Sequence, residues 1–531
     1  MDQQRFDYVI VGAGSAGCVI AYRLVKAGQR VLLLEAGPSH DVKYVHMPAT
    51  FVRVLGTERS WMYQTVPQAH ANGRTMFVPQ GRMTGGGSSI NAMVYIRGNA
   101  ADYDDWAAAG CRGWAWADVL PAFKRAENNV RFSGAMHGTD GPLHVCDTRH
   151  RHPLSLAFLK GAQEAGLAYN DDFNSGRQEG VGFYQTTTLE GSRAGTAMAY
   201  LAQVQQDRNL TLANGAHALR ILIDGGLARG VEYRRGDGTV QRATAEREIV
   251  VTAGTLATPK LLQVSGVGPG PLLQQLGIPV HADLPGVGEN YQDHLEIIAH
   301  GRCRDPISMF GQDKGLTALK HGLQWTLFKT GLLTSNVVEC GGFVDTVGGG
   351  RPDVQFHVLP VLVGDIDRPM PEIHGISVDP CFLHPKSRGR VHAKSPDAMQ
   401  PPEFDGGYLS EQDDVDTLVR GLKLARRILR MPSMRKVIAE ELYPGARDDI
   451  PDAELEQFVR QYAKTVYHPV GTCRMGGEAD AWAVVDSELR VRGIRGLRVC
   501  DASVMPSIVS GNTNAPTIMI AERGAEFMLA R

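Results

Sequence analysis

Hydrophobic positions near the start of the chain change period twice, which predicts a strand, a helix and a second strand. Residues 8–11 form an unbroken apolar run, typical of a parallel strand that is buried on both faces. Ala16, Ile20 and Leu24 then recur at helical spacing, and a second apolar run covers residues 31–34. The order strand, helix, strand indicates an α/β fold with a parallel sheet.

A glycine-rich turn joins the first strand to the helix. Gly12, Gly14 and Gly17 fit the G-x-G-x-x-G spacing, in which one glycine allows the tight turn, one lets a pyrophosphate approach the backbone, and one lets the helix pack close to the strand. The second strand ends in Glu35, where an acid can bind the 2′-hydroxyl of an adenosine ribose. These features predict a dinucleotide site; the alternative is a glycine turn in an unrelated α/β protein. The acid disfavours NADP but does not separate NAD from FAD.

The next two hundred residues predict shorter elements. Residues 38–63 mix aromatic and polar side chains without a period, so we expect a loop or lid there and assign it no chemistry. Residues 154–167 predict an isolated helix, and residues 196–205 are expected to return the chain to the first domain. Strand-like segments follow at residues 209–223, 227–233 and 247–252.

Glycine-rich turns become rare after about residue 297. Residues 355–362 and 375–383 predict strands, and residues 413–430 and 452–462 predict helices. We therefore expect a second domain, built on an antiparallel sheet, that holds the substrate.

Length and composition agree with two domains. The chain has 531 residues, which exceeds what one hydrophobic core usually supports. Its 43% hydrophobic and 21% charged residues are typical of a soluble globular protein, and a net charge of −2 gives no overall field that would attract nucleic acid or an acidic membrane. We predict no nucleic-acid partner, and the composition leaves the oligomeric state open.

Eight cysteines are scattered without a C-x-x-C pair, which disfavours a zinc site and a disulfide framework. We expect no metal and reduced thiols in the cytoplasm. The first residues continue directly into the first strand, so we expect no signal peptide. No apolar run reaches the length of a membrane span, although peripheral contact with the inner membrane stays open.

Residues 81–98 form a second glycine-rich stretch, with small side chains at Gly85, Gly86 and Ser89. Such a turn can lie flat against a phosphate or an aromatic ring system because no side chain projects from it. Taken alone, the segment favours such a contact, with a flexible surface linker as the alternative.

The run Gly81-Arg82-x-x-Gly85-Gly86-Gly87-Ser88-x-Ile90-Asn91 resembles the first signature of the glucose–methanol–choline (GMC) oxidoreductases, and residues 102–124 continue the resemblance. Residues 254–268 are similar to the second signature of that family, and residues 284–294 follow in the family manner. Thr84 stands where the family usually has an aliphatic residue, from which we expect only a small change in packing. His294 is expected to be a hydrogen-bonded scaffold group rather than a catalyst.

Residues 465–476 place His468 directly before Pro469, which favours an extended backbone and holds the imidazole on a defined loop. Histidine can accept a proton near neutral pH, so the residues alone leave open a catalytic base or a structural histidine. The match to a family motif favours the base. The family's second catalytic position lies about 44 residues later, at Asn512, with Asn514 as a nearby competitor.

The C-terminal segment predicts a helix over residues 517–529, with Pro516 in its first turn. A buried helix start presents free N–H groups and a partial positive charge, which would stabilise negative charge at the pyrimidine edge of a flavin. The alternative is an ordinary capped C-terminal helix.

The resemblance implies an FAD-binding domain with a Rossmann-like fold over residues 1–155, 206–296 and 463–531, and a substrate domain over 156–205 and 297–462. Some family members tether the flavin through a histidine where this chain has Ile90, so we predict non-covalent FAD. The predicted cofactor-binding residues are Gly12, Gly14, Ser15, Ala16, Gly17, Glu35, Ala36, Arg82, Gly85, Gly86, Ser89, Asn91, Ala92, Met93, Val94, Ala218, Ala253, Gly254, Asp501, Ala502, Asn512, Thr513 and Asn514.

The resemblance implies oxidation of an alcohol by proton abstraction and hydride transfer to flavin N5, with His468 and Asn512 as the catalytic pair. We predict a dehydrogenase for choline-like, sugar or polyol (sorbose, for example) or other primary alcohols, with a quinone, a dye-like acceptor or O2 as electron acceptor. The alternatives are an alcohol oxidase of the same family, a lyase or photodecarboxylase that uses FAD without oxidising alcohols, and a non-catalytic flavin-binding protein.

Overall fold

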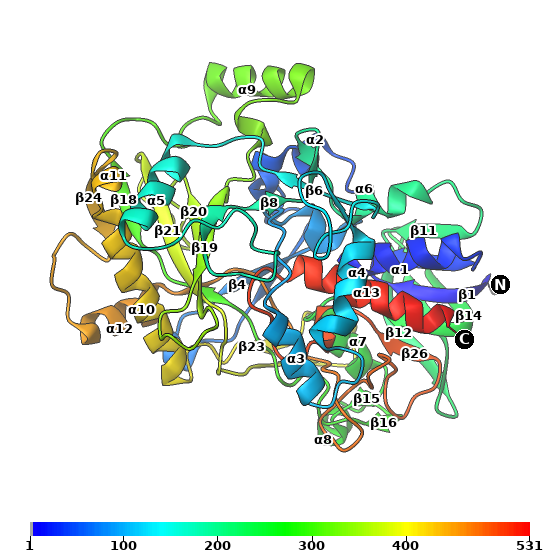
Figure 1. The fold of residues 1–531 in the computed structure, drawn as a ribbon. Coiled ribbons are helices and arrows are strands. Elements are labelled where there is room, and N and C mark those ends of the chain that lie inside the picture. Colours follow the sequence, from blue (N-terminus) through cyan, green and yellow to red (C-terminus); the bar gives the residue numbers. More distant parts are fainter. Residues whose placement is uncertain (1–3, 531) are drawn as a thin grey trace.

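The computed structural model describes residues 4–530, so residues 1–3, which precede the first strand, lie outside the described part. A seven-stranded sheet contains the predicted βαβ unit (Figure 1). Its strand order is β11-β2-β1-β14-β13-β12, with β26 beside β14. Its strands are β1 (Gln4–Val11), β2 (Val31–Glu35), β11 (Leu210–Asn214), β12 (His217–Asp224), β13 (Leu227–Arg234), β14 (Val240–Val251) and β26 (Leu497–Val499).

The central strands β2, β1 and β14 pair in parallel, and the predicted apolar run over residues 8–11 is buried. Every residue of β2 is buried, and Val9 and Ile10 of β1 have no exposed surface. Strand β1 begins at Gln4, earlier than the predicted Tyr8. Helix α1 (Ser15–Lys26) and the C-terminal helix α13 (Asn514–Leu529) lie against each other beside the sheet (Figure 1).

An eight-stranded sheet forms the other half of the molecule, with the main order β24-β18-β21-β20-β19-β7. Its pairs are antiparallel, which confirms the predicted second sheet. Its strands are β7 (Gly180–Phe183), β17 (Leu295–Glu296), β18 (His300–Cys303), β19 (Cys340–Val344), β20 (Val354–Leu359), β21 (Gly375–Phe382), β24 (Ile438–Tyr443) and β25 (Lys464–Thr465). Strands β17 and β25 extend this sheet across the predicted boundaries at residues 296 and 463, so those exact boundaries stay predictions.

Helices cover one side of the antiparallel sheet (Figure 1). The predicted helix over residues 154–167 is α5 (Pro153–Glu164), and it is not isolated, because its buried Leu154 and Phe158 lie on a face that packs against α10 and α11. The covering helices are α5, α10 (Gln412–Leu429), α11 (Pro432–Arg435) and α12 (Asp452–Tyr462).

The segment predicted as a loop or lid, residues 38–63, contains regular structure. Strand β3 (Ser60–Gln64) pairs with β4 (Phe77–Gly81), and a 3₁₀ helix, η1, covers Pro48–Val54. A strand pair of this kind could not be predicted, because its second strand lies outside the segment. Residues 196–205 form two short helices, α6 (Thr196–Ala199) and η4 (Leu201–Gln203).

The remaining elements connect the two sheets or lie at their edges. The helices are α2 (Lys43–His46), η2 (Ala69–Ala71), η3 (Gly86–Ser89), α3 (Ala100–Ala108), α4 (Trp116–Ala126), α7 (Ala257–Val264), α8 (Gly270–Gln275), α9 (Gly315–Phe328), η5 (Leu332–Thr334) and η6 (Ala502–Val504). The strands are β5 (Glu127–Asn129), β6 (Leu143–Asp147), β8 (Gln185–Thr186), β9 (Thr188–Leu189), β10 (Ser192–Arg193), β15 (Val267–Gly268), β16 (Ala282–Asp283), β22 (Arg390–His392) and β23 (Glu403–Asp405). Between residues 4 and 530, no helix combines the length and the apolar composition that crossing a bilayer requires.

Candidate active site

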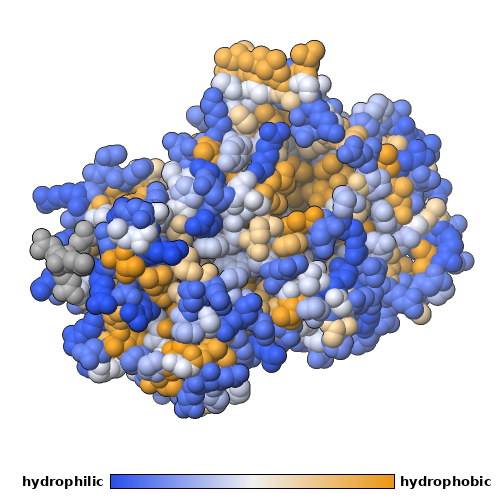
Figure 2. Space-filling view, turned by 180° about the vertical axis from the view of Figure 1, so that it is seen from behind, coloured by the Kyte–Doolittle hydropathy of each residue, from blue (hydrophilic) through white to orange (hydrophobic). Residues whose placement is uncertain are grey.

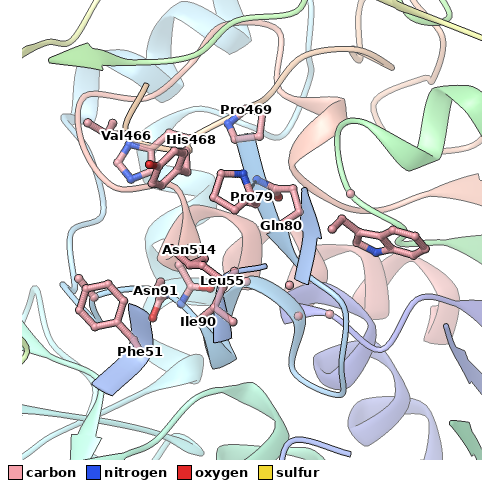
Figure 3. Close-up of a pocket in the computed structure, with 18 of the residues that line it drawn as sticks. Phe51, Leu55, Pro79, Gln80, Ile90, Asn91, Val466, His468, Pro469 and Asn514 are labelled. Atoms are coloured by element: carbon pink, nitrogen blue, oxygen red, sulfur yellow. Dashed lines mark hydrogen bonds between the residues drawn. The ribbon is translucent and has the colours of Figure 1, made fainter. Parts of the chain in front are cut away.

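A cavity of about 870 Å³ is lined by residues of both halves of the molecule (Figure 3). Its walls come from the turn after β1, the glycine-rich stretch before residue 94, the loop over 464–469 and the start of α13. Most of the predicted cofactor residues line it, namely Gly12, Gly14, Ser15, Ala16, Glu35, Ala36, Gly86, Asn91, Ala92, Met93, Val94, Ala218, Ala253, Gly254, Asp501, Ala502, Asn512, Thr513 and Asn514.

The three glycines of the first turn have different surroundings. A Cβ on Gly12 would lie 2.5 Å from the Thr252 carbonyl oxygen, and one on Gly17 would lie 1.9 Å from the Gly12 carbonyl oxygen. A Cβ on Gly14 would approach no atom closer than 3.9 Å. Gly12 and Gly17 therefore allow close packing within the protein, whereas Gly14 keeps open the space in front of the helix.

The starts of two helices meet at the cavity. No side chain caps α1, whose N-cap residue is Gly14, or α13, whose N-cap residue is Thr513. The Ser15 hydroxyl donates a hydrogen bond to Asn514 Oδ1 (2.8 Å) and so joins the two starts. Their free N–H groups and positive dipole ends suit a bound anion or a developing negative charge.

Two buried carboxylates are held by backbone donors at the cavity wall. Glu35 accepts hydrogen bonds from the N–H groups of Ala13 (3.0 Å) and Gly37 (2.8 Å), and burial raises the pKa of its carboxyl group. Asp501 accepts from the Gly254 N–H (2.8 Å) and from the Thr258 hydroxyl (2.7 Å). Both side chains are therefore fixed in place before any ligand binds.

Four predicted cofactor residues do not line the cavity but support it from behind. Gly17 packs α1 against the first turn, and the Gly85 N–H donates to the carbonyl that follows Gly12 (2.6 Å). The Ser89 hydroxyl donates to the Thr84 carbonyl (2.9 Å). The Arg82 guanidinium donates to the Ala36 carbonyl (3.3 Å), directly after β2.

The unusual Thr84 donates its hydroxyl hydrogen to Asn214 Oδ1 (2.9 Å) at the end of β11. This hydrogen bond satisfies a polar group at a position where an aliphatic side chain would need none.

His468 and Asn512 lie together, with His468 Nε2 3.2 Å from Asn512 Nδ2. The backbone N–H of His468 donates to Asp293 Oδ1 (2.8 Å), and this bond fixes the loop before Pro469. Figure 3 shows His468 and Val466 on one side of the cavity and Ile90 and Asn91 on another. Burial lowers the pKa of His468 to about 3, so its imidazole is neutral at ordinary pH.

The hydrogen bonds around His294 determine which nitrogen of His468 carries the proton. His294 Nε2 lies 3.2 Å from the Leu383 carbonyl oxygen, which can only accept, so His294 carries its proton on Nε2. Its Nδ1 is then an acceptor, and His468 Nδ1, 3.1 Å away, must be the donor. A neutral His468 consequently has no proton on Nε2, the nitrogen beside Asn512, so Nε2 is the acceptor. His294 is a scaffold group, as predicted, but its partner is the proposed base itself.

A similar argument orients Asn512. The Tyr184 hydroxyl donates to the Phe356 carbonyl (2.7 Å), so it accepts from the amide nitrogen of Gln355 (3.4 Å). That same nitrogen donates to Asn512 Oδ1 (3.2 Å). The NH2 group of Asn512 therefore points to His468 Nε2.

Our sequence analysis missed a cluster of three ionisable side chains in the cavity. Glu296 contacts Lys464 Nζ through Oε1, and its Oε2 lies 2.9 Å from His357 Nδ1. Burial alone would raise the pKa of Glu296, but Lys464 and His357 outweigh it and lower the pKa to about 2. Glu296 and Lys464 adjoin recognised motifs and could have been proposed from that position, whereas nothing in the sequence marks His357.

The sequence analysis also missed the apolar wall of the cavity. Phe51, Val52, Leu55, Trp61 and Tyr63 come from the segment to which we assigned no chemistry. Further apolar side chains come from the second half of the molecule, namely Met309, Phe310, Val337, Val338, Leu359, Val361, Val363, Ile366 and Val466.

Two family models match this chain, the N-terminal model of GMC oxidoreductase over residues 6–296 and the C-terminal model over residues 385–521. The chain belongs to the GMC oxidoreductase family. The recognition made from the glycine-rich signatures is thereby confirmed, and with it the enzyme class, an FAD-dependent oxidoreductase that acts on alcohols.

Relatives in this GMC family cover nearly the whole chain. An alcohol dehydrogenase [acceptor] from Pseudomonas putida is 44% identical over 535 residues, covering 99% of this chain and 96% of that protein. The mitochondrial choline dehydrogenase of Homo sapiens is 41% identical over 538 residues, covering 99% of this chain and 90% of that protein. The crystal structure of pyridoxine 4-oxidase from Mesorbium loti is 30% identical, with a TM-score of 0.89 and 98% of both chains covered.

The geometry of this GMC oxidoreductase fits FAD. The open space at Gly14 before the uncapped start of α1 suits a pyrophosphate, and Glu35 suits the adenosine ribose. Asp501 lines the same cavity and suits the ribityl chain, and the start of α13 suits the pyrimidine edge of the flavin.

Proposed function

We propose that this enzyme is a dehydrogenase for uncharged primary alcohols with an apolar chain, and that His468 is its catalytic base. One observation carries the proposal. The relay of hydrogen bonds from Leu383 through His294 leaves His468 Nε2 without a proton, with its lone pair facing the Asn512 NH2 group. A substrate hydroxyl that enters between these two groups can donate its proton to Nε2 and accept a hydrogen bond from Asn512.

His468 removes the hydroxyl proton, and the imidazolium that forms keeps its Nδ1–H bond to His294. Asn512 donates to the developing alkoxide oxygen. Bound FAD supplies the acceptor for the hydride that leaves the carbinol carbon, so the alcohol loses one proton and one hydride and becomes an aldehyde. The uncapped start of α13 presents its positive dipole end to the cavity, where it would stabilise negative charge on a bound flavin.

The apolar lining of the cavity supports an uncharged substrate. A quaternary ammonium group needs a free carboxylate or an aromatic cage. Both oxygens of Glu296 are already engaged, one by Lys464 and one by His357. Asp365, another cavity residue, has one oxygen without a hydrogen-bond partner among the described residues, and this oxygen keeps a cationic substrate as the second candidate. The apolar wall described above offers contact to a hydrocarbon chain or an aromatic ring. Choline, sugars and polyols are the second candidate class, and choline is favoured by the 41% identical choline dehydrogenase.

We further propose that FAD is held without a covalent bond, because Ile90 at the family's tethering position has no nucleophilic atom. Acid precipitation should therefore release the flavin into the supernatant. We place the enzyme in the cytoplasm, in peripheral contact with the inner membrane, with a quinone-like acceptor. We propose catalytic roles for His468 and Asn512, and cofactor-binding roles for the predicted residues that line the cavity.

Anaerobic reduction of the flavin tests the proposal directly. Straight-chain primary alcohols should bleach the flavin absorbance, and choline and sorbose should bleach it far more slowly. A faster reaction with choline would overturn the substrate class, and no bleaching by any alcohol would favour a lyase, a photodecarboxylase or a non-catalytic flavoprotein. Under air, reduction of a dye without release of peroxide is expected; peroxide release would identify an oxidase.

A further inference from the structure

Helix α9 (Gly315–Phe328) projects from the body of the protein at the top of Figure 1. Trp325 is its one buried residue, and the Trp325 indole N–H donates to the Gly191 carbonyl (2.8 Å). His321 lies on the same side of the helix and contacts Gln312 Oε1 (3.0 Å). One face of α9 is therefore fixed to the protein.

The opposite face of α9 is a stripe of exposed leucines. Leu316, Leu319, Leu323 and Leu327 are 84%, 58%, 53% and 67% exposed. At 100° per residue their directions fall within an arc of about 80°, on the side away from Trp325. Figure 2 shows apolar side chains along this projecting part of the surface. Such a stripe ordinarily faces a core, and here it faces outward.

The charged side chains within α9 and at its two ends are basic. Residues 314–329 contain Lys314, Lys320 and Lys329 and no acidic residue. Lys314 lies 3.8 Å from Glu372, and Lys329 lies over the Trp325 ring, on the face away from the leucines, so Lys320 is the lysine that borders the stripe. An amphipathic helix with exposed leucines and flanking lysines has the chemistry of a helix that lies in the surface of an anionic bilayer.

We infer that α9 docks this protein on the surface of a membrane that contains anionic lipids. The charge beside the stripe selects a bilayer over a second copy of the chain. Pairing two α9 helices through their leucines would bring the Lys320 side chains of the two copies together, whereas anionic headgroups would neutralise them. The helix has 14 residues, or about 21 Å, and enters only the interfacial layer.

The position of α9 also connects the stripe to the cavity. Met309 and Phe310 line the cavity and lie a few residues before α9. Val52, 55% exposed, also lines the cavity, and its helix η1 contacts η5, which contacts α9. Figure 2 shows a hollow with apolar walls below the projecting helix. A docked enzyme would therefore hold an apolar opening close to the lipid.

Vesicle sedimentation tests this inference without any measurement of catalysis, so it can fail while the proposed oxidation holds. Purified holoenzyme is mixed with vesicles of phosphatidylcholine alone or of phosphatidylcholine with phosphatidylglycerol. We expect sedimentation only with the anionic vesicles, and a loss of binding at high salt. The variant L319Q/L323Q should lose at least about tenfold in vesicle affinity and retain flavin content and oxidation of a water-soluble alcohol. The matched control V240Q replaces an exposed apolar residue, 49% exposed, far from α9 in the chain, and should bind as the wild type does.

Three outcomes would overturn the inference. The wild type could fail to sediment with the anionic vesicles. The L319Q/L323Q variant could bind them as well as the wild type does. Light scattering could show a wild-type dimer that the variant dissociates, in which case a second copy covers the stripe. A drop in flavin content would indicate misfolding, and L319A/L323A, which keeps good helix-forming residues, would then replace the glutamine variant.

Discussion

The two ends of the cavity are built in different ways. At the nucleotide end, backbone N–H groups at the start of α1 face the cavity, and Gly14 keeps the space open. At the reaction end, side chains from distant segments carry the chemistry, among them His468, Asn512 and Glu296. A site made of backbone groups tolerates most changes of side chain. A larger residue in place of one of its glycines, however, would fill the space that the ligand or the packing needs. A side-chain site depends on each charge and each tautomer.

The largest effect is expected at the base. H468A should lower turnover about 10² to 10⁴-fold, because general base catalysis typically contributes that much. The flavin absorbance should remain, since the side chain of His468 bonds to His294 and Asn512 and not to the nucleotide end. Stopped-flow reduction by an alcohol measures the loss.

H357A is the matched control, because His357 lines the same cavity. It should lower turnover much less than H468A. Equal losses in the two variants would mean that the relay through His294 does not select the base.

The next effect is on stability at the reaction end. K464M leaves the buried Glu296 carboxylate without its cation and should lower the free energy of unfolding by about 3–5 kcal/mol. The double variant K464M/E296Q removes both charges and should recover most of that loss. Urea unfolding of the three proteins measures it; a single variant as stable as the wild type would show that the pair is not buried in solution.

A smaller effect is expected at the nucleotide end. G14A adds a methyl group that meets no protein atom within 3.9 Å, so the fold should be unaffected. The same methyl group enters the space where the pyrophosphate would approach, and FAD affinity should fall about tenfold, or 1.4 kcal/mol. Flavin titration of the apoprotein measures it. G322A, at a site with no atom within 4 Å, is the control and should bind FAD normally. Unchanged affinity in G14A would place the pyrophosphate elsewhere.

The smallest effect is on pH dependence. Because burial lowers the pKa of folded His468 from 6.5 to about 3, the residue is neutral and able to act as a base above pH 3. Protonation of His468 should therefore produce no fall in kcat/KM between pH 5 and pH 8.

The same shift affects stability with a definite sign. Below pH 6.5 the unfolded chain binds a proton at His468 that the folded protein does not, so stability falls as the pH drops from 6.5 towards 3. H468Q should show a weaker fall in the urea midpoint over that range. An equal fall in both proteins would contradict the buried, neutral state.

The place of the glycine-rich turns at the cavity could be predicted from sequence, because a tight turn of this kind requires glycine at fixed spacing, and the binding roles of these residues stay predictions. The sequence did not distinguish residues that line the cavity from residues that support its wall. Four predicted cofactor residues lie behind the wall, namely Gly17, Arg82, Gly85 and Ser89. His468 and Asn512 were found because both lie in one C-terminal stretch with a fixed spacing.

The rest of the reaction end depends on contacts between segments. Glu296 meets Lys464 across 168 positions of sequence and His357 across 61. Lys464 lies on the strand beside Glu296, and His357 lies on β20, which β21 separates from Glu296, so both contacts depend on a sheet register that no local pattern fixes. The outward leucines of α9 could not be predicted either, because helical spacing of apolar residues normally indicates a buried face.

The bond between Ser15 and Asn514 has a consequence for how the enzyme matures. It joins two helix starts that are 499 positions apart, and both face the cavity. During translation the ribosome must release residue 514 before this clamp can close. A nascent chain that stops short of α13 therefore lacks one of the two helix starts that face the cavity, and the cavity wall is completed only when the last segment has folded.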